Sequence, residues 1–185
     1  MATIFDGKRF AAEKEVGLQN RVLGLKARGI YPKLASILIG DDQASRLYVG
    51  LKKKAAERIG AELDVYLLKE NTKLEEILVL IGTLNTDVSV QGIMIQMPLP
   101  GELQKYKSEV ITKILPGKDV DGLRTDSEFL HPTSKAVIEI IRKAEEEFGK
   151  KKTVCVVGAW GMVGVPLVKE LKSEGYVVLE ASRDE

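Results

Sequence analysis

Short apolar runs alternate with stretches in which apolar residues recur every three or four positions along this chain of 185 residues. The first pattern is typical of buried β-strands and the second of amphipathic α-helices. We expect strands over 34–39, 63–67, 90–96, 153–157 and 176–181, and helices over 10–28, 43–59, 72–84, 102–114, 132–148 and after a glycine-rich turn at 158–164. Alternating strands and helices favour a mostly parallel sheet covered by helices, so the predicted fold class is α/β.

Apolar spacing also predicts which side chains face the core. In the helix over 43–59, a stripe with four-residue spacing is expected to face inward: Leu47, Leu51, Ala55 and Ile59. In the strand over 63–67, alternation predicts one buried face, formed by Leu63, Val65 and Leu67.

Composition narrows the class of protein. Hydrophobic residues make up 44% of the chain, which argues for a packed core. The formal net charge is +1, which argues against a protein that binds nucleic acid or an anionic membrane. One cysteine cannot form an intrachain disulfide or a cysteine-based zinc site, and we expect no metal centre. The N-terminus has no apolar signal-peptide core, and the uncharged run over 154–168 is too short to span a membrane. We therefore expect a soluble cytoplasmic protein.

A run of charged residues near Gly149 is the best candidate for a domain boundary. The segment 1–148 has the strand–helix alternation of a parallel-type α/β domain. The segment 149–185 has only a strand, a glycine-rich turn, a helix and a final strand, which matches part of a Rossmann-like dinucleotide-binding unit. One such unit cannot cover both faces of its sheet, and its open edges invite pairing. We therefore expect a shortened chain, a natural fragment or a chain completed by a partner.

Two side chains on the second predicted helix are candidates for chemistry. Tyr48 and Lys52 are four residues apart, so they share one face of the helix. On spacing alone, the simpler interpretation is an exposed ring beside a solvated basic face at 52–54, because lysines are mostly exposed. The alternative is a catalytic lysine, since neighbouring positive charge and partial burial let a lysine exchange its proton near neutral pH.

Two further segments carry polar residues at a predicted strand end and in a turn. Gln96 ends the apolar strand G-I-M-I-Q, which we expect to be central in the sheet, and ligands of open α/β sheets bind at the carboxyl edge. Asp119 and Asp121 lie in the loop P-G-K-D-V-D-G, where turns favour aspartate for conformational reasons alone. Taken alone, each segment is better explained by structure than by catalysis.

Together, these segments resemble one known enzyme family. Tyr-Val-x-x-Lys after Ala-Ser, the strand G-I-x-I-Q-x-P-L-P and the loop P-x-K-D-V-D-G have the order and spacing found in the methylenetetrahydrofolate dehydrogenase/methenyltetrahydrofolate cyclohydrolase family. The opening I-F-D-G-K is similar as well. The resemblance implies a bifunctional enzyme of folate one-carbon metabolism, with NADP or NAD as cofactor. Such an enzyme oxidises 5,10-methylenetetrahydrofolate and hydrolyses the methenyl product to 10-formyltetrahydrofolate.

The resemblance also implies a role for each matching residue. Lys52 would be the general acid/base of cyclohydrolysis, Tyr48 would pack on the folate rings, and Gln96 would hydrogen-bond Lys52. Asp121 would hold the amino-pyrimidine edge of the pterin, because a carboxylate offers two acceptors to adjacent N–H donors. Segment 1–148 would then be the folate-binding catalytic domain. We expect a small-molecule folate substrate and a homodimer.

The glycine-rich turn is the candidate dinucleotide site. Gly158, Gly161 and Gly164 lie between a strand and a helix, where backbone N–H groups can approach a pyrophosphate, although the same glycines would also serve close packing. Trp160 replaces the serine usual in the family at this place, and Val165 stands where a basic residue is common.

The last strand carries candidates for recognising the ribose. Glu180 stands where a Rossmann acid contacts a ribose hydroxyl. Ser182 and Arg183, directly after it, would instead suit the 2′-phosphate of NADP. The two remaining reactive side chains have structural interpretations: we expect His131 to be a loop residue and Cys155 to be a buried small apolar residue in a strand.

Other functions stay open. The chain could be a cyclohydrolase alone, because Lys52, Gln96 and Asp121 are present while the dinucleotide unit is partial. It could also be a non-catalytic folate- or nucleotide-binding fragment, since the family's late P-G-G-V-G-P-x-T segment is not in the sequence. A generic nicotinamide-dependent epimerase or reductase fits less well, because its glycine-rich loop would lie near the N-terminus rather than at Gly158.

Overall fold

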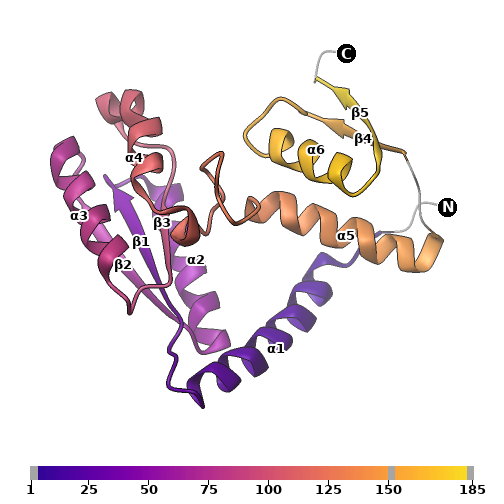
Figure 1. The fold of residues 1–185 in the computed structure, drawn as a ribbon, viewed down its shortest axis with the longest axis horizontal. Helices are drawn as coiled ribbons and strands as arrows, with labels where there is room; N and C mark the ends of the chain where they lie inside the picture. The colour runs from indigo at the N-terminus through magenta and orange to yellow at the C-terminus, as the bar shows by residue number, and fades with distance from the viewer. Residues whose placement is uncertain (1–3, 150–152, 183–185) are drawn as a thin grey trace. The chain divides into compact units, whose positions relative to one another are not determined.

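A computed structural model describes residues 4–149 and 153–182 (Figure 1). The helices are α1 (Gly7–Lys26), α2 (Gln43–Ile59), α3 (Leu74–Thr86), α4 (Lys107–Lys113), α5 (Pro132–Phe148) and α6 (Gly164–Ser173), with short 3-10 helices η1 (Gly101–Tyr106) and η2 (Pro116–Lys118). The strands are β1 (Lys33–Ile39), β2 (Glu62–Leu68), β3 (Gly92–Ile95), β4 (Thr153–Val157) and β5 (Val177–Ala181). The predicted α/β class is confirmed. Within the described ranges, no helix is both long enough and apolar enough to cross a membrane.

The chain divides into two compact units, Met1–Asp119 and Val120–Glu185. This division precedes the boundary expected near Gly149, because α5 packs with the elements that come after it. Ile138 of α5 belongs to the same buried cluster as Val156 of β4 and Leu171 of α6. The division by function, with a folate-binding segment 1–148 and a dinucleotide-binding segment 149–185, stays a prediction.

The first unit is built on a three-stranded parallel sheet in the order β2–β1–β3. The central strand is β1, so the expectation that the strand before Gln96 is central is wrong. Both β1, buried over 35–39, and β3, buried throughout, have the burial of a central strand, but within the described sheet only β1 has a strand on each side. A strand covered on both faces and paired on both edges needs such a continuous apolar run. Beyond β3, the described residues add only an isolated parallel bridge between Ile93 and Asp119.

The two faces of this sheet are covered differently. Alternate residues of β1 pack against α3 and α4 in a buried cluster that includes Ala35, Ile37, Ile39, Ile77, Ile81, Leu84, Val110 and Ile114. Helix α2 packs against β1 and β2 on the other face. The inward residues of α2 are Ser45 and Val49, whereas Leu47 and Leu51 are exposed. The predicted stripe is therefore wrong at Leu47 and Leu51, where the neighbouring stripe with Ser45 and Val49 faces inward instead, whereas Ala55 and Ile59 are half-buried.

Strand β2 also departs from the predicted alternation. Leu63 is buried, but Val65 and Leu67 are 39% and 54% exposed. Tyr66 and Leu68 pack against the core in their place. Among the described residues β2 pairs only with β1, so it presents apolar side chains beside an unpaired backbone edge.

The second unit contains the parallel pair β4–β5, with α5 and α6 contributing to one buried cluster. The inward-facing positions of the strands, Val154, Val156 and Val178, belong to that cluster. The alternate positions Val157, Val177 and Leu179 are exposed, as is the thiol of Cys155. The expectation that Cys155 is buried is therefore wrong, because within the described residues only one face of this sheet is covered.

Two fully buried serines give a test of the packing. The Ser36 hydroxyl of β1 has no hydrogen-bond partner among the described residues, whereas the Ser134 hydroxyl donates to the Val163 carbonyl at 2.9 Å. A buried unsatisfied hydroxyl costs about 1–3 kcal/mol. We expect Ser36→Ala to raise the free energy of unfolding of the first unit by about 1 kcal/mol, and Ser134→Ala to lower that of the second by about 1 kcal/mol. Urea titrations followed by circular dichroism measure both changes, and a loss of stability in Ser36→Ala would show that its hydroxyl is satisfied after all.

Candidate functional site

Helix α2 is fixed at both ends. Its N-cap Asp42 accepts a 2.7 Å hydrogen bond from the backbone N–H of Ser45, and it ends at Gly60, whose φ of 80° needs a residue without a side chain. Hydrogen bonds from Ser45 hold the pKa of the Asp42 carboxyl below its usual value, so the cap stays charged at neutral pH. Because α2 follows β1 directly, its N-terminus lies at the carboxyl edge of the sheet.

This placement brings Lys52 and Gln96 together. Side chains of a helix lean toward its N-terminus, so Lys52 extends toward the carboxyl edge, where Gln96 follows β3. The Lys52 ammonium Nζ donates to Gln96 Oε1 at 3.3 Å. The Gln96 backbone N–H continues the ladder by donating to the Ile37 carbonyl at 2.9 Å. Two residues that are 44 positions apart in the sequence, one on α2 and one directly after β3, thus meet in one hydrogen bond.

The orientation of the Gln96 amide is set by a second bond. Its Nε2 donates to the Met97 carbonyl at 3.0 Å, which leaves Oε1 to face Lys52. Both Lys52 and Gln96 are half-buried, whereas Lys53 and Lys54 are exposed. The three lysines are therefore not equivalent, and the simple interpretation of a solvated basic face does not describe Lys52.

Tyr48 lies one turn before Lys52 on α2 and is 59% exposed. Its ring is accessible to a planar ligand that reaches the carboxyl edge. The same edge is hollowed between β1 and β2 by a cavity of about 440 Å³, lined by Gly40, Asp41, Arg46, Leu67, Leu68, Lys69 and Glu70. Neither Lys52 nor Gln96 lines this cavity.

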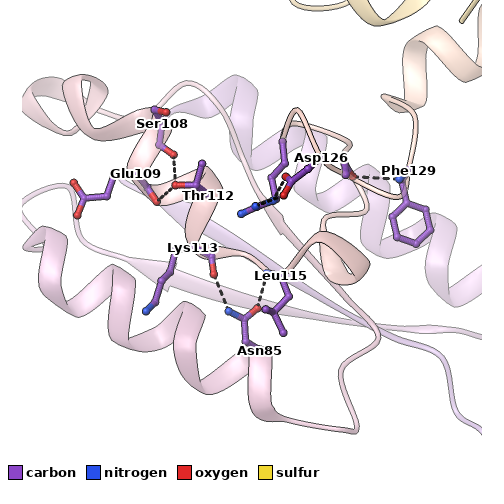
Figure 2. A network of polar contacts seen from close by, with 10 residues as sticks. Asn85, Ser108, Glu109, Thr112, Lys113, Leu115, Asp126 and Phe129 are labelled. Carbon is purple, nitrogen blue, oxygen red and sulfur yellow. Dashed lines mark hydrogen bonds and ion pairs between the residues drawn. The ribbon is translucent and has the colours of Figure 1, made fainter.

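The loop after α4 is tied to the end of α3 by side chains that the sequence patterns did not single out. Asn85 donates from Nδ2 to the Lys113 carbonyl at 2.8 Å and accepts from the Leu115 N–H at 3.1 Å (Figure 2). Lys118 donates to the carbonyls of Leu84 and Asp87, at 2.8 Å each. An ammonium at the carbonyl end of a helix satisfies groups that the helix itself leaves unpaired. Lysine and asparagine near a helix end are common, so spacing alone gave no signal.

The two aspartates of this loop have different surroundings. Asp119 is 1% exposed and bridges to β3 at Ile93, so it belongs to the core of the first unit. Asp121 is half-buried and lies in the second unit. The structure thus joins Lys52 and Gln96 directly, places Tyr48 beside them on α2, and assigns Asp121 to the other unit.

In the second unit, the glycines of the turn serve distinct needs. A Cβ on Gly164 would lie 2.1 Å from the Gly158 carbonyl oxygen, so only glycine fits there. Gly158 has a φ of +81° with open space around it, and Gly161 is also near only its own turn. No side chain caps the N-terminus of α6, while the N–H groups of Gly158, Ala159 and Gly161 donate to backbone carbonyls. Trp160 is 59% exposed.

The end of β5, where Glu180 lies, is hydrogen-bonded to this turn. The Gly158 N–H donates to the Ala181 carbonyl at 2.8 Å, which ties the turn to the end of β5. Glu180 accepts a 2.6 Å hydrogen bond from the Lys172 ammonium, a partner that the sequence patterns did not indicate. Ser182 is half-buried, and Arg183 lies outside the described residues.

The remaining histidine caps a helix. His131 is the N-cap of α5, and its Nδ1 accepts from the Thr133 N–H at 3.3 Å. In the ranges that the structure describes, no three histidine, cysteine, aspartate or glutamate side chains are grouped so as to hold a metal ion.

Comparison with known proteins identifies what this arrangement is similar to. The family model described as the catalytic domain of tetrahydrofolate dehydrogenase/cyclohydrolase matches residues 5–121. The bifunctional protein FolD of Staphylococcus aureus is 39% identical over 180 residues, which cover 92% of this chain and 62% of that protein. This chain therefore spans less than two thirds of that relative.

Solved structures agree. The bifunctional FolD methylenetetrahydrofolate dehydrogenase/cyclohydrolase of Campylobacter jejuni has a TM-score of 0.88 at 35% identity, covering 99% of this chain and 67% of that one. The Trypanosoma brucei FolD enzyme, solved with NADP cofactor and inhibitor, has a TM-score of 0.86 at 29% identity, covering 98% of this chain and 64% of that one.

Packing in the glycine-rich turn predicts a difference between two matched substitutions. Gly164→Ala would place a methyl group against the Gly158 and Ala159 carbonyls at 2.1 and 2.7 Å, whereas Gly161→Ala meets its nearest atom at 3.3 Å. We expect Gly164→Ala to destabilise the second unit by about 1–3 kcal/mol, as overpacking does, and Gly161→Ala to have less than half that effect. Thermal unfolding followed by circular dichroism compares the two. Equal effects would show that the turn does not close as described.

Proposed function

The chain belongs to the tetrahydrofolate dehydrogenase/cyclohydrolase family, and on that premise we propose that it acts in folate one-carbon metabolism. The proposed reactions are NADP-dependent oxidation of 5,10-methylenetetrahydrofolate to 5,10-methenyltetrahydrofolate and hydrolysis of that product to 10-formyltetrahydrofolate. The observation that carries the proposal is the Lys52–Gln96 hydrogen bond at the carboxyl edge of the sheet, inside the matched domain.

For hydrolysis, Lys52 is the proposed general acid/base. Its neutral amine takes a proton from water as the oxygen attacks the cationic methenyl carbon. The ammonium then donates a proton to N5 as the C–N5 bond breaks, and the hydroxyl proton of the intermediate passes to solvent as the formyl carbonyl forms. Gln96 supports both states because its Oε1 accepts from either the amine or the ammonium. Since Nε2 is held by the Met97 carbonyl, Gln96 keeps this acceptor in place while the lysine changes charge.

For substrate binding, we propose that Tyr48 packs on the folate rings and that Asp121 accepts from the amino-pyrimidine edge of the pterin. The exposure of the Tyr48 ring and its place one turn from Lys52 support the first role. The second role rests on the match of the K-D-V-D-G loop to the family's pattern.

For oxidation, the residues of the second unit fit a dinucleotide. Because Gly158 and Gly161 have no side chains and no side chain caps the start of α6, a pyrophosphate can approach the turn, and Trp160 offers an exposed ring beside it. Gly164 closes the turn, and from their place in the sequence directly after β5 we assign recognition of a 2′-phosphate to Ser182 and Arg183. A bound nicotinamide would supply hydride acceptance at C4, while the protein positions the two reactants.

Substituting Lys52 tests the hydrolytic mechanism. We expect Lys52→Met to lower the turnover number for methenyltetrahydrofolate hydrolysis by about 10²–10⁴, because general acid–base catalysis contributes that much. The loss of the methenyl chromophore measures the rate. Lys53→Met, at the next and exposed lysine, is the matched control and should keep the wild-type rate. Retained hydrolysis in Lys52→Met with an unchanged circular dichroism spectrum would reject the assignment.

The same assay separates the alternative functions. Adding methylenetetrahydrofolate with NAD or NADP and following reduced nicotinamide reports the dehydrogenase. Both signals support the bifunctional enzyme, hydrolysis alone supports a cyclohydrolase, and binding without either signal supports a binding fragment.

We also propose a cytoplasmic location. The free thiol of Cys155 supports it, because free thiols are typical of a reducing compartment.

We further propose that the chain forms a homodimer through β2. Its unpaired edge and the outward side chains of Val65 and Leu67 are the features that strand pairing between copies requires.

A charge on β2 tests the dimer. We expect Leu67→Glu to convert the sedimenting species from dimer to monomer, because each copy would bring a carboxylate into the apolar part of the interface. Val88→Glu, in an exposed position after α3, is the control and should leave the dimer unchanged. A wild-type chain that sediments as a monomer at high concentration would overturn this proposal.

A further inference from the structure

The backbone position of the acidic residue near the end of β5 is the one from which a side chain contacts the ribose of a dinucleotide. Glu180 is the next-to-last residue of β5, and its register partner Val156 lies two residues before Gly158. The hydrogen bond from the Gly158 N–H to the Ala181 carbonyl holds this strand end against the glycine-rich turn. In dinucleotide-binding units an acid at this place accepts a hydrogen bond from the ribose 2′-hydroxyl, and this contact favours NAD.

Its carboxylate, however, is already engaged. Glu180 Oε1 accepts from Lys172 Nζ at 2.6 Å, and the Glu180 side chain is 29% exposed. Lys172 lies in the last turn of α6, whereas the glycine-rich turn leads into the first. The start of α6 and Lys172 are separated by about 12 Å of helix, at 1.5 Å per residue. The Glu180 carboxylate is therefore held by a cation from the last turn of α6 before any ribose binds.

We propose that the Lys172–Glu180 ion pair withdraws this carboxylate from a bound dinucleotide and so favours a 2′-phosphorylated dinucleotide over one with a free 2′-hydroxyl. This inference rests on the proposed function of the glycine-rich turn. The pair acts in two ways. It removes the acceptor that would reward a 2′-hydroxyl, and it neutralises a negative charge that would repel a 2′-phosphate. Lys172 is thus a specificity-determining residue that need not touch the dinucleotide.

The test measures binding of NADP and NAD by isothermal titration calorimetry, with quenching of the single tryptophan, Trp160, as an independent readout. We expect the wild-type chain to bind NADP more tightly. In Lys172→Met the freed carboxylate should strengthen NAD binding and weaken NADP binding. The ratio of the two affinities should then move about fivefold toward NAD, the effect of one partly exposed charge interaction. Because part of the effect is repulsion, the shift should shrink at high salt.

Two further variants make the result specific. In the double variant Lys172→Met with Glu180→Gln, the ratio should return toward the wild-type value, because the charge that repels the 2′-phosphate is gone. Lys169→Met removes the same charge from the same helix at an exposed position and should leave the ratio unchanged. An equal shift in Lys169→Met would show a general charge effect and overturn the inference.

The outcomes also separate this inference from the function on which it rests. If the wild-type chain binds a dinucleotide but Lys172→Met leaves the ratio unchanged, the inference alone fails. If the wild-type chain binds neither dinucleotide by either readout, the proposed cofactor role of the turn fails and the inference fails with it.

Discussion

The burial of β1 on both faces is the constraint on which the first unit depends. β1 has five consecutive buried residues and lies between β2 and β3 in the described sheet. The helix that leaves β1 must start at the carboxyl edge, and the strand at one side of β1 must deliver its following residue to the same edge. Lys52 and Gln96 meet because of this topology, and not because of any attraction strong enough to gather them. A single partly exposed hydrogen bond contributes about 1 kcal/mol.

Much of this arrangement was predictable from the sequence, because it depends on the spacing of apolar residues and on the residues that begin and end each element. The continuous apolar run of β1, the aspartate before α2 and the glycine after it are local signals, and each element formed where they indicate. The choice of the inward face of α2 was not local. Leu47 and Leu51 are apolar and well spaced, but the helix instead places Ser45 and Val49 toward the sheet. Which of two adjacent stripes is buried depends on how closely helix and sheet approach, which spacing does not contain.

The candidate site was predictable to a similar extent. Spacing alone favoured a structural interpretation of Lys52 and Gln96, and the family resemblance singled them out. The structure supplied the bond between them and the second bond that orients the amide. Partners that act across the fold could not be found in this way. Lys172 and Glu180 are eight residues apart on a helix and a strand, and Lys118 reaches α3 over 31 and 34 residues. Such pairs depend on how the elements run past one another in the fold and on how far each side chain reaches. A search for sequence motifs contains neither quantity.

The loop after α4 is held by the end of α3, so its attachment depends on the length of that helix. Lys118 reaches two carbonyls at the end of α3, and Asn85 holds the backbone of the loop from the same turn. Each residue added to a helix rotates the remainder of that helix by about 100°. A one-residue insertion within α3 would swing these carbonyls away from the ammonium and release the loop, even though every residue of the loop itself were unchanged. Homologues with a longer or shorter α3 would therefore need a different clasp at this point.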